Sequence, residues 1–198
     1  MSYAFQDHYF HRAKKDNYLA RAVYKLEEIQ KKHRLIRPGD RVLDLGAAPG
    51  SWLQLTGGIV GPSGRVLGVD LKKIDHPFPS NVVTLQRDIF EQNFLEEIKA
   101  QYGPFDVVLS DMAPATTGIR SADSARSALL FEQALHIALA TLKPGAHFLA
   151  KIFQGSDFHV LLLEVKVHFE WVKVIKPDAS RKRSKEIYIC AMRLRKSD

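Results

Sequence analysis

From Arg41 onward, short apolar runs rich in Val, Ile and Leu alternate with longer segments of helical periodicity. This alternation is the strongest constraint on the fold, because strands that alternate with helices form parallel sheets joined by crossover helices. Runs such as RVLDL and FDVVLS are apolar almost throughout, which is typical of strands that are buried on both faces. The pattern predicts an α/β fold: a doubly wound, seven-stranded, mostly parallel sheet with helices on both faces.

The expected elements follow from the length of each run and from the Gly and Pro turns between them. We expect strands at Arg41–Leu45, Arg65–Asp70, Val82–Gln86, Phe105–Ser110, Ala146–Ile152, Val172–Ile175 and Glu186–Met192. We expect helices at Trp52–Val60, Phe90–Tyr102, Ala122–Leu142 and Asp157–Val167, and a basic amphipathic helix at Tyr18–His33. Nothing marks a linker, so residues 1–198 are expected to form a single domain with a basic N-terminal extension up to about residue 37.

Composition narrows the class of protein. Hydrophobic residues make up 45% of the chain, charged residues 26%, and there is one cysteine, which excludes fibrous, disordered and disulfide-framework proteins. No apolar run approaches the ~20 residues of a membrane span, and the start is too polar for a signal peptide, so we expect a cytoplasmic protein. The net charge is +7, with basic ends around an acidic middle. Clustered Lys and Arg bind nucleic-acid phosphates; the alternative is a merely solvated surface.

The densest motif is a strand that runs into a glycine-rich turn and then a helix, VLDLGAAPGSW. Gly46 and Gly50 allow the backbone to approach a ligand closely, and Asp70 ends the next strand, where doubly wound sheets bind ribose hydroxyls. Asp88 follows the third strand at the same edge of the sheet. Pro49 lacks an N–H group, so the turn suits a ligand without phosphates. We therefore predict an S-adenosylmethionine site; a nicotinamide site and a purely structural turn are the alternatives.

Two strand ends supply a candidate catalytic pair. Asp111 ends the run LSDMAP, and Lys151 lies in LAKIFQG. Both ends are expected at the same crevice, where an acid and a lysine can position a nucleophile and handle its proton. A simple ion pair is the alternative interpretation. A lysine in an apolar strand is costly unless it is paired or functional, which favours a catalytic role.

Taken together, DLGAAPGSW, SDMAP, KIFQG and SRKRSKEIYI resemble the RrmJ/FtsJ family of S-adenosylmethionine-dependent RNA 2′-O-ribose methyltransferases. The resemblance covers nearly the whole chain and implies a Rossmann-like class I methyltransferase fold. It also implies a catalytic tetrad of Lys25, Asp111, Lys151 and Glu186. The implied cofactor contacts are Gly50, Trp52, Asp70, Asp88 and Asp111. Ser51 replaces a frequent glycine, and Ala115 stands where asparagine is common.

The compact size resembles the bacterial members that methylate a uridine of large-subunit (23S) ribosomal RNA. This resemblance implies ribosomal RNA within the large ribosomal subunit as the partner. We expect a monomer without membrane contact. A transfer RNA substrate and a non-catalytic RNA-binding module that retains the fold are the alternatives. In the catalytic reading, Lys151 is the base or orienting donor, Asp111 holds Lys151 and the methyl-bearing end of the cofactor, and Lys25 and Glu186 set charge and substrate position.

Further residues are candidates for a nucleophile, a metal site or RNA contacts. Cys190 lies inside the apolar run IYICAM and is predicted to be a core residue rather than a nucleophile. His8 and His11 lack partners at metal-ligand spacing, so no metal site is predicted. Basic side chains bracket two tetrad positions and predict an RNA phosphate track: Arg12, Lys14, Lys15, Arg21, Lys31, Lys32, Arg34, Arg181, Lys182, Arg183 and Lys185. The candidates for base stacking are Tyr18, Tyr24 and Phe153, with core packing as the alternative.

Overall fold

The computed structural model describes residues 3–180 and 184–196, with side chains from residue 8 onward. Its strands are β1 (Arg41–Leu45), β2 (Arg65–Asp70), β3 (Val82–Gln86), β4 (Phe105–Ser110), β5 (Leu142–Phe153), β6 (Phe169–Ile175) and β7 (Glu186–Leu194). Its helices are α1 (Tyr3–Lys15), α2 (Val23–His33), α3 (Ser51–Val60), α4 (Phe94–Gln101), α5 (Arg120–Thr141) and α6 (Phe158–His168).

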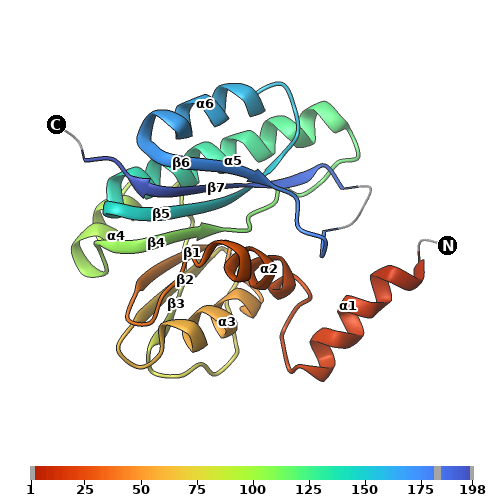
Figure 1. Ribbon diagram of the computed structural model, residues 1–198, viewed down its shortest axis with the longest axis horizontal. Coiled ribbons are helices and arrows are strands. Elements are labelled where there is room, and N and C mark those ends of the chain that lie inside the picture. The colour runs from red at the N-terminus through yellow and green to blue at the C-terminus, as the bar shows by residue number, and fades with distance from the viewer. Residues whose placement is uncertain (1–2, 181–183, 197–198) are drawn as a thin grey trace.

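The strands form one seven-stranded sheet in the order β3-β2-β1-β4-β5-β7-β6 (Figure 1). Strands β1 to β5 pair in parallel, whereas β7 is antiparallel to both β5 and β6. The strand order reverses between β1 and β4, and the crevice outside such a reversal is where doubly wound sheets bind ligands. The predicted seven-stranded, mostly parallel fold is therefore confirmed.

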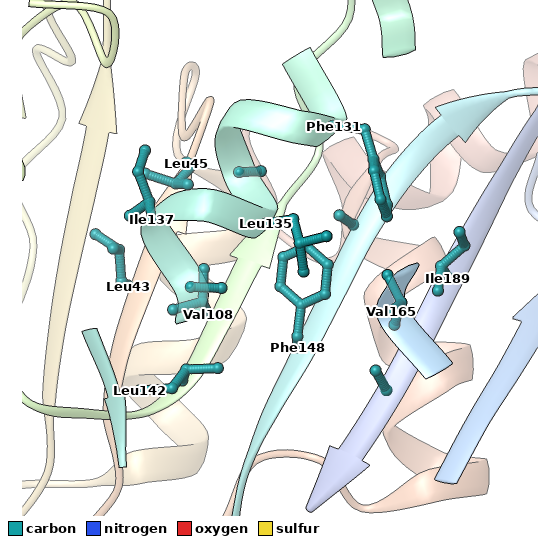
Figure 2. Close-up of a cluster of buried hydrophobic side chains, with 14 of the residues drawn as sticks. Leu43, Leu45, Val108, Phe131, Leu135, Ile137, Leu142, Phe148, Val165 and Ile189 are labelled. Atoms are coloured by element: carbon teal, nitrogen blue, oxygen red, sulfur yellow. The ribbon is translucent and has the colours of Figure 1, made fainter. Parts of the chain in front are cut away.

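Two apolar clusters cover opposite faces of the sheet. Helices α4, α5 and α6 pack on one face, where Phe131 of α5 contacts Phe148 of β5 with ring centroids 5.7 Å apart (Figure 2). Helices α2 and α3 pack on the other face through Leu26, Ile29 and Leu53. Because central strands such as β1 and β4 are buried from both sides, their side chains are mostly apolar, as the sequence pattern indicated, whereas the edge strands β3 and β6 are partly exposed.

The N-terminal region differs from the prediction. The expected helix Tyr18–His33 begins only at Val23, and a separate helix, α1, precedes it. Tertiary hydrogen bonds engage the backbone between the two helices, because Leu19 N–H donates to Gln54 Oε1 (2.9 Å) and Trp52 Nε1–H donates to the Ala22 carbonyl (2.9 Å). The sequence analysis did not predict α1, which covers Tyr3–Lys15.

Smaller differences concern element ends. Helix α4 begins at Phe94 rather than Phe90, because residues 88–91 form a turn in which Glu91 N–H donates to the Asp88 carbonyl. Strand β5 begins at Leu142, directly after α5, and its pairing with β4 shifts register near Phe105. Over the described residues, the structure contains no helix with the length and apolar content needed to cross a bilayer.

Candidate active site

The glycine-rich turn lies between β1 and α3, at the point where the strand order reverses. Gly46 and Gly50 both adopt positive φ angles, +77° and +110°. A Cβ atom on Gly46 would lie 2.5 Å from Met112 Cγ, and one on Gly50 would lie 2.7 Å from Phe78 Cζ. Glycine is therefore required at both positions, because a side chain would be strained at these φ angles and would collide with neighbouring atoms.

Asp70 fixes the shape of this turn. Its carboxylate accepts hydrogen bonds from the backbone N–H groups of Ala48 (2.9 Å) and Lys72 (2.8 Å), one on each oxygen. The carboxylate thus joins the end of β2 to the glycine-rich turn that follows β1. Asp70 also lines the adjoining cleft, which is a suitable position for the predicted contact with a ribose. That contact stays a prediction.

The cleft beside the turn has a volume of about 560 Å³. Its walls come from the ends of β1, β2, β3 and β4 and include Gly46, Asp70, Asp88, Phe90, Asp111 and Met112. The structure thus brings four of the predicted cofactor residues to one cavity. Gly50 and Trp52 are not among the described residues that line it; Trp52 is buried, with its ring 6.1 Å from that of Tyr188.

Asp44 of β1 is a further acid at this edge, and sequence analysis did not single it out. It is completely buried, and neither carboxyl oxygen has a hydrogen-bond partner among the described residues. Burial raises the pKa of Asp44 well above its ordinary value, and the nearby charges of Asp111 and Asp70 raise it further. The one signal available in the sequence was an acid in the otherwise apolar stretch VLDL.

Lys151 and Asp111 form the predicted pair. Lys151 Nζ lies 2.9 Å from Asp111 Oδ1 and donates to the Asp111 backbone carbonyl at 2.5 Å. Its side chain is only 5% exposed. Burial raises the pKa of Asp111, but Lys151, Lys25 and the hydroxyl of Tyr188 outweigh that effect and leave the pKa below its ordinary value. Asp111 is therefore an anion that holds the buried Nζ of Lys151 at a fixed position.

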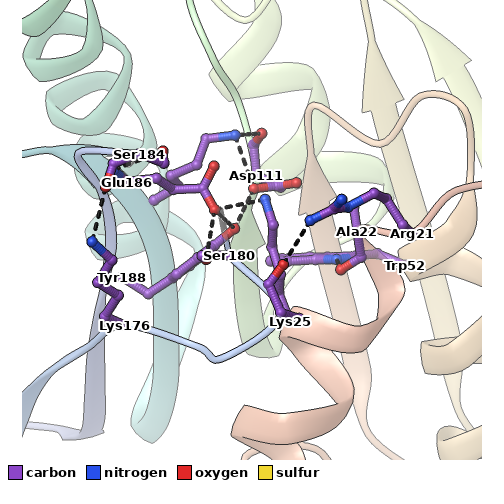
Figure 3. Close-up of polar contacts among 12 residues, drawn as sticks. Arg21, Ala22, Lys25, Trp52, Asp111, Lys176, Ser180, Ser184, Glu186 and Tyr188 are labelled. Carbon is purple, nitrogen blue, oxygen red and sulfur yellow. Dashed lines mark hydrogen bonds and ion pairs between the residues drawn. The ribbon is translucent and has the colours of Figure 1, made fainter. Parts of the chain in front are cut away.

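Lys25 and Glu186 form a second ion pair, with Lys25 Nζ 2.6 Å from Glu186 Oε1 (Figure 3). Their side chains are 12% and 13% exposed. The hydroxyl of Ser180 also donates to Glu186 Oε1, at 3.0 Å. Lys25 comes from α2 and Glu186 from the first residue of β7, so this pair joins the two ends of the described chain.

Tyr188 connects the two pairs and was missed by sequence analysis. Its hydroxyl donates to Asp111 Oδ1 at 2.6 Å and lies 3.5 Å from Glu186 Oε1 (Figure 3). Tyr188 is the register partner of Lys151, and Phe153 is that of Glu186. Burial raises the pKa of Tyr188 well above its ordinary value, as do Asp111 and Glu186, so it remains a neutral donor. The signal in the sequence was the period of two that places residues 186 and 188 on the same face of a strand.

The structure therefore brings all four tetrad residues together, although they come from α2, β4, β5 and β7 or from the residue after the strand. The Tyr188 hydroxyl lies between the carboxylates of Asp111 and Glu186, and each carboxylate is paired with one of the two lysines. Asp111 also lines the cofactor cleft, so the tetrad and the cleft share one residue. Such an arrangement can orient a hydroxyl nucleophile at the edge of the cleft and take up its proton.

The alternatives to this arrangement are a cysteine nucleophile and a metal site. Cys190 is completely buried in β7, and burial raises the pKa of its thiol to about 12, so it is a core residue as predicted. No cluster of three or more His, Cys, Asp or Glu side chains with metal-binding geometry occurs within the described part of the chain.

Comparison with known proteins connects this geometry to a family. Residues 18–194 match the model of the FtsJ-like methyltransferase family. "Ribosomal RNA large subunit methyltransferase E" of Syntrophobacter fumaroxidans is 66% identical over 197 residues, which cover 100% of both chains. The protein of the same name from Desulfatibacillum aliphaticivorans is 51% identical over 93% of this chain and 89% of its own.

Solved structures show the same architecture. A ribosomal RNA methyltransferase from Plasmodium falciparum superposes with a TM-score of 0.78 at 28% identity, over 89% of this chain and 98% of its own. Fibrillarin of Aeropyrum pernix, with natively bound S-adenosyl-L-methionine, shares only the fold, with a TM-score of 0.58 at 19% identity over 88% and 75% of the two chains. From the extent of the family match and the identity to these relatives, the chain is a member of the FtsJ-like methyltransferase family.

Proposed function

We propose that this methyltransferase transfers a methyl group from S-adenosylmethionine to the 2′-hydroxyl of a uridine in large-subunit ribosomal RNA. The observation that carries the proposal is the place of Asp111. It lines the cofactor cleft, and its Oδ1 also lies 2.9 Å from the buried Nζ of Lys151. A methyl donor in the cleft and a ribose hydroxyl oriented by Lys151 would then both lie beside Asp111.

The cleft suits S-adenosylmethionine in shape and charge. The close approach at Gly46 leaves room for a ligand against the backbone, and the four carboxyls of Asp44, Asp70, Asp88 and Asp111 gather at one edge. A ligand with positive sulfonium and ammonium groups reduces the repulsion among the three carboxyls that line the cleft, those of Asp70, Asp88 and Asp111. When bound, S-adenosylmethionine supplies an electrophilic methyl group. Gly46, Asp70, Asp88 and Asp111 would hold it.

Lys151 acts on the nucleophile. The ribose hydroxyl is a weak acid, so transfer requires alignment of its oxygen and a destination for its proton. Lys151 Nζ, fixed by two oxygens of Asp111, either accepts the proton as a neutral amine or donates a hydrogen bond that orients the oxygen. The 2′-oxygen would form its new bond to the methyl carbon as the carbon–sulfur bond of the bound methyl donor breaks, and the proton would pass from the oxygen to Lys151 Nζ or to water.

The other polar residues position these groups. Tyr188 donates to Asp111 and keeps that carboxylate ionised. Lys25 and Glu186 neutralise each other at 2.6 Å and line a small cavity of about 260 Å³ together with Arg21, Ala22 and Ser184. This cavity, the tetrad cavity, is lined by two of the four tetrad residues and is the proposed seat of the acceptor ribose.

The RNA substrate is inferred from the names of the relatives and from charge. Both relatives described above are named for methylation of large-subunit ribosomal RNA. Part of the proposed phosphate track is paired within the protein, because Lys31 and Lys32 form ion pairs with Glu27 and Glu28. Lys14, Lys15, Arg34 and Lys185 remain in the proposed track, whereas Arg181, Lys182 and Arg183 lie outside the described residues.

Several finer points belong to the same proposal. We place the enzyme in the cytoplasm, as a single-domain monomer that acts on ribosomal RNA within the large subunit. Transfer RNA is the rival acceptor. A binding module without turnover has to explain why four buried or half-buried charges of a methyltransferase tetrad are paired within one site.

Transfer of labelled methyl groups tests the proposal. Wild-type protein is incubated with labelled S-adenosylmethionine and, separately, with unmodified large ribosomal subunits, free ribosomal RNA and transfer RNA. We expect label on the ribose of large-subunit RNA. Label on transfer RNA alone would keep the chemistry and replace the substrate, and binding without label on any acceptor would favour a non-catalytic module.

A further inference from the structure

A third cavity, of about 390 Å³, adjoins the tetrad cavity. We call it the Phe153 pocket. It is lined by Thr116, Arg120, Ser124, Phe153, Ser184 and Lys185, together with Asp123. Ser184 lines both this pocket and the tetrad cavity, so the two cavities are neighbours. A strand of nucleic acid that places a ribose in the tetrad cavity therefore passes directly to the Phe153 pocket.

Phe153 stands beside the catalytic residues on the sheet. It is the register partner of Glu186, and Lys151 lies two residues before it on the same strand. Side chains of register partners, and of residues two apart, share one face of a sheet. The ring of Phe153 thus belongs to the same face and the same strand end as the tetrad.

The ring of Phe153 does not pack into the apolar core formed by the described residues. Phe153 is only partly buried, and it belongs to none of the three apolar clusters formed by the described residues. By contrast Tyr24, which the sequence also proposed for stacking, is buried in such a cluster, and its hydroxyl donates to Asp16. Of these two rings, Phe153 alone presents a surface next to the tetrad.

Hydrogen bonds hold the Phe153 backbone in place from two sides. Phe153 N–H donates to Ser127 Oγ of α5 at 3.0 Å, and Gln154 N–H donates to the Lys185 carbonyl at 3.0 Å. A Cβ atom at Gly155 would lie 2.6 Å from Ser124 Cβ, so the strand end packs tightly on α5. The aromatic surface is therefore fixed before any ligand arrives, which lowers the entropic cost of binding.

The charges around the ring suit phosphates. Arg120 and Lys185 are exposed, and neither side chain makes an ion pair or hydrogen bond with another described residue. Asp123 is occupied, because its carboxylate accepts hydrogen bonds from Thr117 N–H (2.8 Å), the Thr117 hydroxyl (2.9 Å) and Gly118 N–H (3.2 Å). Two available cations beside an aromatic ring are the elements of a single-stranded nucleic-acid site.

We propose that the Phe153 pocket binds the nucleotide next to the methylated one, with its base stacked on Phe153 and its phosphate groups held by Arg120 and Lys185. This inference rests on the proposed RNA substrate. Stacking on an aromatic face tolerates any base, so the pocket selects for an unpaired neighbour rather than for a particular sequence. The enzyme then requires a target whose flanking base is free to leave a helix.

Position-specific cross-linking tests the location directly. A photoreactive phenylalanine analogue replaces Phe153 in the full-length protein, and the complex with unmodified large ribosomal subunits is irradiated. We expect the cross-linked nucleotide to be the immediate neighbour of the nucleotide that wild-type protein methylates. A cross-link elsewhere, or none while methylation proceeds, would overturn the assignment. Absence of methylation by wild-type protein would instead contradict the proposed function.

Kinetics test the energetics. Phe153→Leu keeps an apolar side chain but removes the aromatic face, and we expect kcat/KM for the subunits to fall about tenfold with unchanged cofactor affinity. Arg120→Gln combined with Lys185→Gln should reduce the salt slope of RNA binding by about two. Lys166→Gln, on the exposed face of α6, is the matched charge control and should change neither quantity. Unchanged kcat/KM in Phe153→Leu, or an equal salt effect in the Lys166 control, would contradict the inference.

Discussion

The cofactor cleft and the tetrad meet at Asp111, yet they are built from different kinds of contact. The cleft is shaped by backbone: two glycines with positive φ and a turn held by N–H groups on Asp70. The tetrad is shaped by side chains that converge from α2, β4, β5 and β7. The cleft is therefore encoded locally, within single strand-turn-helix units, whereas the tetrad exists only after distant elements have packed.

This difference predicts that changes in the tetrad reduce the rate of transfer, whereas changes in the turn reduce cofactor affinity. The largest effect is expected for Lys151→Ala. Loss of a positioned proton acceptor or donor should lower kcat by about 10²- to 10⁴-fold, with cofactor affinity nearly unchanged, as measured by labelled methyl transfer and by calorimetry. A variant with a near wild-type rate would remove Lys151 from the mechanism.

The same substitution leaves Asp111 without its closest cation, and an unpaired buried charge destabilises a protein. Thermal unfolding must therefore be measured beside activity. Lys151→Met, which retains much of the side-chain volume, separates loss of chemistry from loss of packing. We expect both variants to be inactive at temperatures where both remain folded.

Gly46→Ala tests the cleft side of the comparison. The added Cβ would lie 2.5 Å from Met112 Cγ at a φ of +77°, so the turn has to shift. We expect the affinity for S-adenosylmethionine to fall at least tenfold, about 1.4 kcal/mol, with kcat at saturating cofactor less affected. Gly58→Ala is the control, because a Cβ there meets no atom within 4 Å and the residue lies inside α3. It should leave affinity unchanged and stabilise the fold slightly.

Tyr188→Phe tests the connection between the two ion pairs. It removes a 2.6 Å hydrogen bond to Asp111 but keeps the ring in the core. A hydrogen bond to a charged group contributes about 1.5–3 kcal/mol. Loss of that free energy in the transition state should lower kcat by about 10- to 10²-fold. Tyr188 lowers the pKa of Asp111, so its removal should raise that pKa and move the acid limb of the pH–rate profile to higher pH. An unmoved acid limb would contradict this role.

Asp44→Asn gives the smallest expected change in rate and the clearest change in stability. The folded-state pKa of Asp44 is raised, so its contribution to stability is present below the pKa of the unfolded chain and is lost as the pH rises through the folded-state pKa. The amide does not titrate. In urea unfolding, the free energy of unfolding of the variant should therefore increase relative to that of the wild type between pH 4 and pH 7. Equal differences at both pH values would contradict the assigned protonation of Asp44.

The same contrast explains what the sequence could predict. The strands β1 to β4 were placed at their observed bounds, because each is a continuous apolar run between turn residues. The glycine turn, Asp70 and Asp88 followed from local pattern and spacing. The tetrad followed from a family resemblance, since no local pattern indicates that Lys25 reaches Glu186 across the fold. Asp111 and Lys151 were nevertheless suggested by their strand ends.

The residues that were missed depend on tertiary surroundings. Tyr188 looked like an ordinary strand aromatic, and only the pairing of β7 with β5 places its hydroxyl on Asp111. Asp44 looked like part of the strand, and only complete burial without a partner marks it. The later start of α2 is accompanied by hydrogen bonds of Leu19 and Ala22 with Gln54 and Trp52, which lie far along the chain.

The ion pair between Lys25 and Glu186 can form only after the last strand of the sheet has been synthesised. The residues that line the cofactor cleft all lie between Gly46 and Leu130, whereas Glu186 and Tyr188 belong to the last strand of the sheet. A nascent chain emerges from its N-terminus, and its early parts begin to fold first. The parts of the cofactor site are thus available before the chemistry is, and a ribosome that is still making this protein holds a chain that has not yet assembled its catalytic centre.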